Sequence, residues 1–288
     1  MLNAHPRIAI TPETHFMPFY WAKAGQYGDL GDEAAFRRLV EDIVATGDLR
    51  EWGLSADEFR AAAWAGERTF AAVLGTILDL FARVKNADIR GEKSPSHVLY
   101  VGEIKKVFPE ACFVHMVRDP RAVVNSRREQ SWCPKGIREN TLFWVEQVSA
   151  GVNGARKLGR DWITVRYEDL IQHAEKTLRG VCARFGIEFE PSMLEYWKHN
   201  HRLLDLDREP WNINASRPLQ PDRVDRWRSQ FSRAEVLEIE TLAWPLMRTF
   251  GYSPVSPWLS LLPSVASRAS ADAVRSMRRW ARELRRRR

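Results

Sequence analysis

The sequence contains little cysteine and no long apolar run. Its three cysteines, Cys112, Cys133 and Cys182, are odd in number and far apart, and no Cys-x-x-Cys pair occurs. This pattern excludes a disulfide framework and argues against a cysteine-based metal cluster, so we expect reduced thiols and no bound metal. Because no run of 18 uncharged apolar residues exists, no membrane-spanning helix is predicted. Residues 1–6 do not resemble a signal peptide, and we therefore expect a cytoplasmic location.

The body of the chain also lacks an excess of either charge. The net charge is +7, and the tail Arg268–Arg288 accounts for all of it with nine Arg against two acidic residues. Apolar residues recur there at helical spacing, so residues 258–288 are predicted to form an Arg-rich amphipathic tail. Such a tail is either a solvated helix or a contact for an acidic surface or a membrane. No nucleic-acid partner is expected, because residues 1–267 are formally neutral.

What the sequence does contain is an alternation of strand and helix patterns. Helices are predicted over 33–48, 55–65, 67–86, 96–107, 138–158, 172–185, 191–199 and 233–250, and strands over 88–93, 112–117 and 161–167. Residues 112–117 form an apolar run around one histidine, which is typical of a strand buried on both faces. The alternation predicts an α/β fold with a mainly parallel sheet flanked by helices.

The sharpest chemical signal follows the strand predicted at 112–117. Arg118 stands at its carboxyl end, where open α/β sheets bind ligands. Asp119 and Pro120 begin a helix as N-cap and first residue, and the helix N-terminus favours anions. Ser126 adds a hydroxyl eight residues after Arg118. A forked guanidinium and a hydroxyl suit a phosphate, whereas an ion pair between Arg118 and Asp119 or another carboxylate is the alternative.

Two blocks in combination resemble the sulfotransferase family. Residues 91–95 read Gly-Glu-Lys-Ser-Pro, and residues 118–121 read Arg-Asp-Pro-Arg with Ser126 after them. Their order and spacing are similar to the bacterial branch related to tyrosylprotein sulfotransferases. That family transfers a sulfonate from 3′-phosphoadenosine 5′-phosphosulfate (PAPS) to an acceptor hydroxyl or amine. The resemblance implies a sulfotransferase domain over residues 1–257 with a P-loop-NTPase-like fold, PAPS as co-substrate, no metal and a hydroxyl-bearing acceptor.

The resemblance also assigns residues to the co-substrate. Arg118 and Ser126 match the pair that binds the 3′-phosphate of PAPS in that branch. Tyr167 opens a Tyr-Glu-Asp-Leu segment and matches the tyrosine that contacts the adenine. Arg217 precedes Pro218 and resembles the basic residue of a segment that closes over the nucleotide.

Two further positions match the catalytic residues of the family. Lys93 matches the lysine at the bridging oxygen of the leaving nucleotide, where an ammonium stabilises the transition state more than the ground state. An acceptor hydroxyl also needs a base. The histidine that phenol- and steroid-type enzymes use two residues after the lysine is Pro95 here. The tyrosylprotein-like branch uses a glutamate shortly after Ala-His-Pro, which makes Glu13 the first candidate and leaves His97 as the second.

One family feature is missing from the printed sequence. The 5′-phosphosulfate of PAPS is bound in the family by a loop resembling Pro-Arg-Ser-Gly-Thr-Thr, about a dozen residues before Ala-His-Pro. Ala-His-Pro stands here at residues 4–6, so we expect the first strand and this loop to be absent. Either a misplaced start codon or a shortened protein would account for this absence. The alternative function is then a catalytically impaired, truncated nucleotide-binding or protein-interaction remnant of the same fold.

Overall fold

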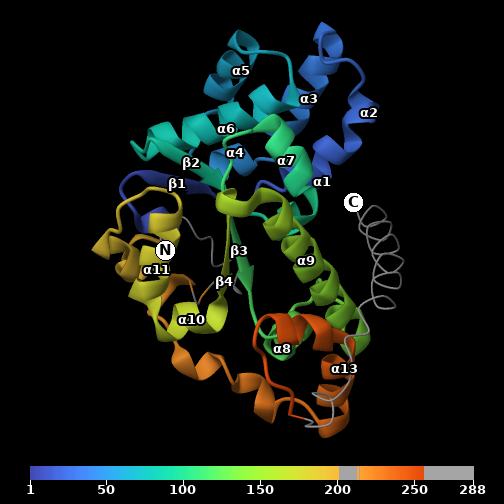
Figure 1. Cartoon of the computed structure of the whole chain (residues 1–288). Helices are drawn as coiled ribbons and strands as arrows, with labels where there is room; N and C mark the ends of the chain where they lie inside the picture. The colour runs from blue at the N-terminus through green and yellow to red at the C-terminus, as the bar shows by residue number, and fades with distance from the viewer. Residues whose placement is uncertain (201–212, 214, 256–288) are drawn as a thin grey trace. The chain divides into compact units, whose positions relative to one another are not determined.

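The computed structural model describes residues 1–200, 213 and 215–255, so the predicted tail at 258–288 lies outside the described residues. The chain divides into two compact units (Figure 1). Of the described residues, unit 1 comprises Met1–Ala111, 186–200, 213 and 215–218, and unit 2 comprises Cys112–Phe185 and 219–255. Each unit contains one pair of parallel strands and its own apolar core.

Unit 1 is built on strands β1 (Ile8–Thr11) and β2 (Ile89–Glu92), which pair in parallel with Thr11 opposite Glu92. The chain between them is helical and comprises α1 (Phe16–Phe19), η2 (Trp21–Lys23), α2 (Ala24–Tyr27), α3 (Glu33–Ala45), α4 (Asp48–Glu51), α5 (Ala56–Ala65) and α6 (Phe70–Val84). The other elements of the unit are η1 (Leu2–Ala4), η3 (Pro95–Tyr100), α7 (Val101–Val107), η5 (Pro191–Glu195) and α12 (Trp197–Asn200). Helix α6 packs along both strands, as Figure 1 shows.

The three longest helices of unit 1 begin at capping residues that the sequence supplies. The side chains of Asp32, Ser55 and Thr69 each accept a hydrogen bond from a backbone N–H three residues later. Such caps satisfy N–H groups that have no partner inside the helix. The apolar faces of these helices meet in the main core, whose fully buried side chains include Phe36, Leu39, Phe59, Val73 and Phe81. The helices predicted at 33–48, 55–65 and 67–86 are confirmed with ends that differ by up to three residues.

Unit 2 is built on strands β3 (Phe113–Val117) and β4 (Trp162–Arg166), which pair in parallel with Val117 opposite Arg166. Its other elements are α8 (Pro120–Glu129), α9 (Ile137–Leu158), η4 (Gly159–Asp161), α10 (Tyr167–Gln172), α11 (Ala174–Arg184), η7 (Pro221–Arg223), η8 (Arg226–Ser229) and α13 (Arg233–Thr249). Helix α9 contacts α8, α13 and β4 and carries part of the core with α13 (Figure 1). The predicted α/β class with parallel strands is confirmed.

The prediction that residues 112–117 are buried on both faces is wrong. In β3 the side chains of Val114 and Met116 are 37% and 45% exposed, whereas Val117 is buried. Within unit 2 the other face packs closely on α9, where a Cβ added to Gly151 would lie 2.1 Å from the His115 ring. Burial on that face lowers the pKa of His115 to about 4. An apolar run does not reveal which of its two faces a neighbouring helix covers.

We expect Gly151→Ala to destabilise unit 2 by about 1–3 kcal/mol, because the new methyl group overlaps the His115 ring. The matched control is Gly180→Ala in helix α11, where an added Cβ has no atom within 4 Å. That control is expected to be neutral or stabilising by up to about 1 kcal/mol, since alanine is the better helix former. Urea unfolding curves of both variants measure the difference, and equal stability of Gly151→Ala and the wild type would contradict the close contact.

Candidate functional site

The candidate residues fall into two groups. Glu13 and Lys93 belong to unit 1, and so does Arg217. The other group, Arg118, Ser126 and Tyr167, belongs to unit 2.

In unit 1 the parallel strands bring Glu13 and Lys93 together. Thr11 ends β1 opposite Glu92, which ends β2, so the residues that follow both strands lie at one edge of the sheet. Lys93 Nζ donates to Glu13 Oε1, and the second oxygen of Glu13 lies 3.2 Å from His15 Nε2. The Lys93 side chain is 63% exposed and that of Glu13 is 34% exposed. Burial alone would raise the pKa of Glu13, but His15 and Lys93 outweigh it and lower the pKa.

His97, the second candidate for the base, has a different partner. Its Nδ1 lies 2.6 Å from Glu92 Oε2, and both side chains are largely buried. Of the two candidates for the base, Glu13 is therefore the one in contact with Lys93.

In unit 2 the parallel strands bring Arg118 and Tyr167 together. Val117 pairs with Arg166 at the ends of the two strands, so the residues that follow them, Arg118 and Tyr167, lie at the same edge of the sheet. The guanidinium carbon of Arg118 lies 4.4 Å from the centre of the Tyr167 ring. Arg118 Nη2 donates to the carbonyl oxygen of Arg223 over 3.1 Å, while its Nε is buried without a hydrogen-bond partner among the described residues. A buried N–H donor without a partner beside an aromatic ring is suited to an anionic group attached to a flat base.

The side chains of Ser126 and Arg217 take no part in the contacts described above. Ser126 is exposed in the second turn of α8, where its backbone oxygen accepts a bond from Gln130. Arg217 is exposed in unit 1, and its carbonyl oxygen accepts a 2.7 Å bond from the hydroxyl of Tyr196.

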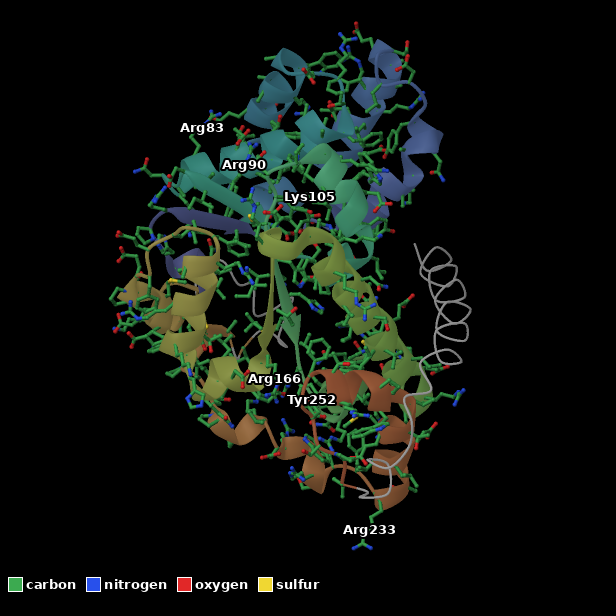
Figure 2. The ribbon with its side chains drawn as sticks, viewed as in Figure 1. Arg83, Arg90, Lys105, Arg166, Arg233 and Tyr252 are labelled. Carbon is green, nitrogen blue, oxygen red and sulfur yellow. The ribbon has the colours of Figure 1, made fainter. Side chains whose placement is uncertain are left out.

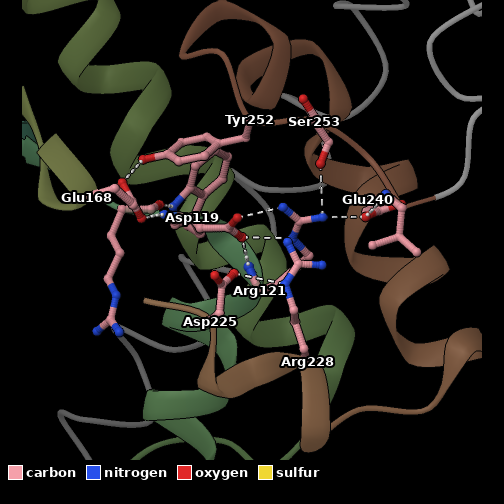
Figure 3. Close-up of polar contacts among 11 residues, drawn as sticks. Asp119, Arg121, Glu168, Asp225, Arg228, Glu240, Tyr252 and Ser253 are labelled. Atoms are coloured by element: carbon pink, nitrogen blue, oxygen red, sulfur yellow. Dashed lines mark hydrogen bonds and ion pairs between the residues drawn. The ribbon is translucent and has the colours of Figure 1, made fainter. Parts of the chain in front are cut away.

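A buried ionic network, which the sequence reasoning missed, supports the Arg118 segment (Figure 3). The carboxylate of Asp119 accepts bonds from the backbone N–H of Arg121 and from its Nε and Nη2. Asp119 therefore pairs with Arg121, and the alternative that it pairs with Arg118 is wrong. Nη1 of Arg121 donates to Glu240 over 2.6 Å and to the carbonyl oxygen of Ser253 over 3.1 Å. The second arginine of the Arg-Asp-Pro-Arg block thus ties the start of α8 to α13 and to the segment after it.

Glu168 connects this network to the Tyr167 segment. Its Oε1 accepts the backbone N–H of Asp119 over 3.0 Å, and its Oε2 accepts the hydroxyl of Tyr252 over 2.8 Å. Burial and the nearby Glu168 carboxylate raise the pKa of Tyr252. The guanidinium carbon of Arg166 lies 4.7 Å from the centre of the Tyr252 ring, and Figure 2 labels both side chains. Glu168 directly follows Tyr167 and accepts the N–H of Asp119, the residue next to Arg118, so it connects the two candidate residues. Its place directly after the strand predicted at 161–167 was the available sequence signal.

We expect Arg121→Ala to destabilise unit 2 by about 3–5 kcal/mol, because it leaves the buried carboxylates of Asp119 and Glu240 without their partner. The control is Arg179→Ala, which removes an exposed pair with Glu175 in α11 and is expected to cost about 1 kcal/mol or less. Chemical denaturation measures both. A loss in Arg121→Ala no larger than that of the control would mean that the network does not support the unit.

Among the described residues, no helix is both long and apolar enough to span a bilayer. The same residues contain no group of three or more His, Cys, Asp or Glu side chains that could hold a metal ion.

The chain matches known proteins along most of its length. A sequence profile described as "Sulfotransferase family" matches residues 1–191. Protein-tyrosine sulfotransferase A of Caenorhabditis elegans is 24% identical over 265 residues, and the match covers 88% of this chain and 63% of that protein. Protein-tyrosine sulfotransferase 2 of Gallus gallus is 22% identical over 277 residues, covering 88% of this chain and 65% of that protein. The chain thus spans slightly less than two thirds of the length of these two relatives.

A shorter match and a solved structure agree with the profile. An omega-hydroxy-beta-dihydromenaquinone-9 sulfotransferase of Mycobacterium bovis is 32% identical over 121 residues, which covers 36% of this chain and 31% of that protein. The solved sulfotransferase domain from the Synechococcus olefin synthase aligns with a TM-score of 0.59 at 22% identity and covers 88% of both chains. This likeness confirms the predicted sulfotransferase fold.

Proposed function

Because the chain belongs to the sulfotransferase family, we propose that it transfers a sulfonate group from PAPS to the hydroxyl of an acceptor. The observation that carries the proposal is the contact between Lys93 and Glu13 at the carboxyl edge of β1 and β2. A carboxylate can accept the proton of a hydroxyl, and an ammonium can stabilise the charge that develops on a leaving oxygen, so this sheet edge carries both groups that the transfer would use.

The proposed reaction assigns one task to each of these two residues. Glu13 accepts the proton of the acceptor hydroxyl while the new oxygen–sulfur bond forms. Lys93 stabilises the negative charge that develops on the bridging oxygen as the old sulfur–oxygen bond breaks. The lowered pKa of Glu13 keeps its carboxylate ionised at neutral pH, as a base must be. The exposure of Lys93 leaves its ammonium accessible to a ligand.

The Arg118 group supports nucleotide binding. We assign the 3′-phosphate to Arg118 and Ser126 and the adenine to Tyr167, because the buried Nε of Arg118 has no hydrogen-bond partner in the described part of the chain and its guanidinium lies over the Tyr167 ring. Arg217 is assigned to the segment that closes over the nucleotide on the strength of the sequence resemblance. The acceptor is proposed only as a hydroxyl-bearing compound, since the similar proteins are named for protein tyrosines and for a hydroxylated menaquinone.

We expect Arg118→Ala to weaken binding of 3′-phosphoadenosine 5′-phosphate (3′,5′-ADP) by about 10- to 100-fold, because a hydrogen bond to a charged group is worth roughly 1.5–3 kcal/mol. Isothermal titration calorimetry measures the affinity. Arg179→Ala, an exposed arginine of the same unit, serves as the control and is expected to bind like the wild type. Wild-type affinity in Arg118→Ala would refute the phosphate assignment.

Glu13→Gln tests the proposed reaction itself. We expect turnover to fall by about 100-fold or more, because the amide cannot accept the proton, while the affinity for 3′,5′-ADP stays the same. Transfer of labelled sulfonate from PAPS to 4-nitrophenol and to a tyrosine-containing peptide is the measurement. The matched control is Glu41→Gln on α3, which alters a carboxylate paired with Arg60 of α5 and should transfer like the wild type. A wild type that binds 3′,5′-ADP tightly but transfers nothing to either acceptor or to water would support the non-catalytic remnant.

A further inference from the structure

Glu92 is a buried carboxylate that the proposed reaction does not use. Its side chain is 8% exposed, and it occupies the last position of β2, directly before Lys93. A buried carboxylate is unfavourable unless hydrogen bonds and opposite charge compensate its lost hydration.

The contacts of Glu92 join the segments that carry the two candidate catalytic residues. Oε1 accepts the backbone N–H of Thr14 over 3.0 Å and the Thr14 hydroxyl over 2.9 Å. The same oxygen accepts the hydroxyl of Ser94, and Oε2 pairs with His97 Nδ1. Thr14 directly follows Glu13, and Ser94 directly follows Lys93. The carboxylate of Glu92 therefore binds the residue that follows Glu13 and the residue that follows Lys93.

The backbone next to Glu13 is held in a strained shape by these contacts. His15 has φ +47°, in the left-handed region that costs a residue with a side chain about 1–2 kcal/mol. Its N–H donates to Ser94 Oγ over 3.1 Å, and the N–H of Phe16 donates to Thr14 Oγ1 over 3.2 Å. Both acceptors are themselves bound to Glu92. The N–H groups of Thr14, His15 and Phe16 are thus bonded to Glu92 or to hydroxyls that Glu92 binds. These bonds stabilise the turn at residues 13–15.

We propose that Glu92 is a positioning residue: it fastens the 13–15 turn to the end of β2 and so holds Glu13 in contact with Lys93, while His97 anchors its second oxygen. The inference rests on the proposed function only in calling Glu13 and Lys93 catalytic. Burial alone would raise the pKa of Glu92, but His97, Ser94 and Thr14 outweigh it and lower the pKa, so the carboxylate stays ionised.

The first measurement needs no enzyme activity. The Glu13 carboxyl is titrated by ¹³C NMR in protein labelled at glutamate Cδ, with the signal assigned from Glu13→Gln. In the wild type His15 and Lys93 hold the pKa of Glu13 below its ordinary value. We expect Glu92→Ala to raise the pKa of Glu13 toward about 4.3, the value of a free glutamate, because the turn is released and the contact with Lys93 loosens.

The second measurement separates positioning from general support. We expect kcat for sulfonate transfer to fall tenfold or more in Glu92→Ala. The dissociation constant for 3′,5′-ADP should stay unchanged, because Arg118, Ser126 and Tyr167, which are assigned to its 3′-phosphate and adenine, lie in unit 2. Glu92→Gln keeps an oxygen that can accept from Thr14 and Ser94, so it should recover most of the lost rate. If Glu92→Ala does not fold, Thr14→Val removes one hydroxyl of the same connection at nearly constant volume and should shift both readouts in the same direction. The control is again Glu41→Gln, for which neither readout should move.

The outcomes are distinct. An unchanged Glu13 titration and an unchanged kcat in Glu92→Ala, or in Thr14→Val if the former is unfolded, would overturn the proposal. A parallel loss of kcat and of 3′,5′-ADP affinity would also overturn it, because it would reveal general structural damage. A shifted Glu13 titration in a protein whose wild type transfers no sulfonate would refute the proposed function and leave the positioning of Glu13 by Glu92 standing.

Discussion

Parallel strand pairing is the constraint on which both groups of candidate residues depend. Two parallel strands end at the same edge of a sheet, so residues that follow them become neighbours however far apart they are in the sequence. In unit 1, Thr11 stands opposite Glu92, and the Glu13–Lys93 contact follows from that register. In unit 2, Val117 stands opposite Arg166, and the Arg118–Tyr167 contact follows in the same way.

A buried carboxylate reinforces each of these strand ends. Glu92 accepts the backbone N–H of Thr14, and Glu168 accepts the backbone N–H of Asp119. Glu92 is the last residue of β2 and Glu168 is the second residue of α10, which follows β4, while each N–H group lies within three residues after the other strand of the pair. The loss of hydration of each carboxylate is offset at its second oxygen, by the ion pair with His97 for Glu92 and by the hydroxyl of Tyr252 for Glu168. The fold thus uses buried carboxylates to fix the segments that follow the partner strands.

Neighbouring residues at the end of β2 differ in exposure. Lys93 is largely exposed and therefore free to meet a ligand, whereas Glu92 beside it is buried and fixed. Arg118 is half-buried, and the Asp119–Arg121 pair beside it is buried.

The sequence by itself determined the features that depend on a few neighbouring residues. The apolar periodicity predicted the helices at 33–48, 55–65 and 67–86, and two short blocks carried the resemblance that pointed to Lys93 and Arg118. Only the tertiary structure decided which face of β3 is exposed, that Arg121 forms an ion pair with Glu240 across 119 positions, and that His97 pairs with Glu92. Capping and periodicity act within one or two turns, whereas burial and long-range ion pairs depend on which surfaces meet after the strands have paired.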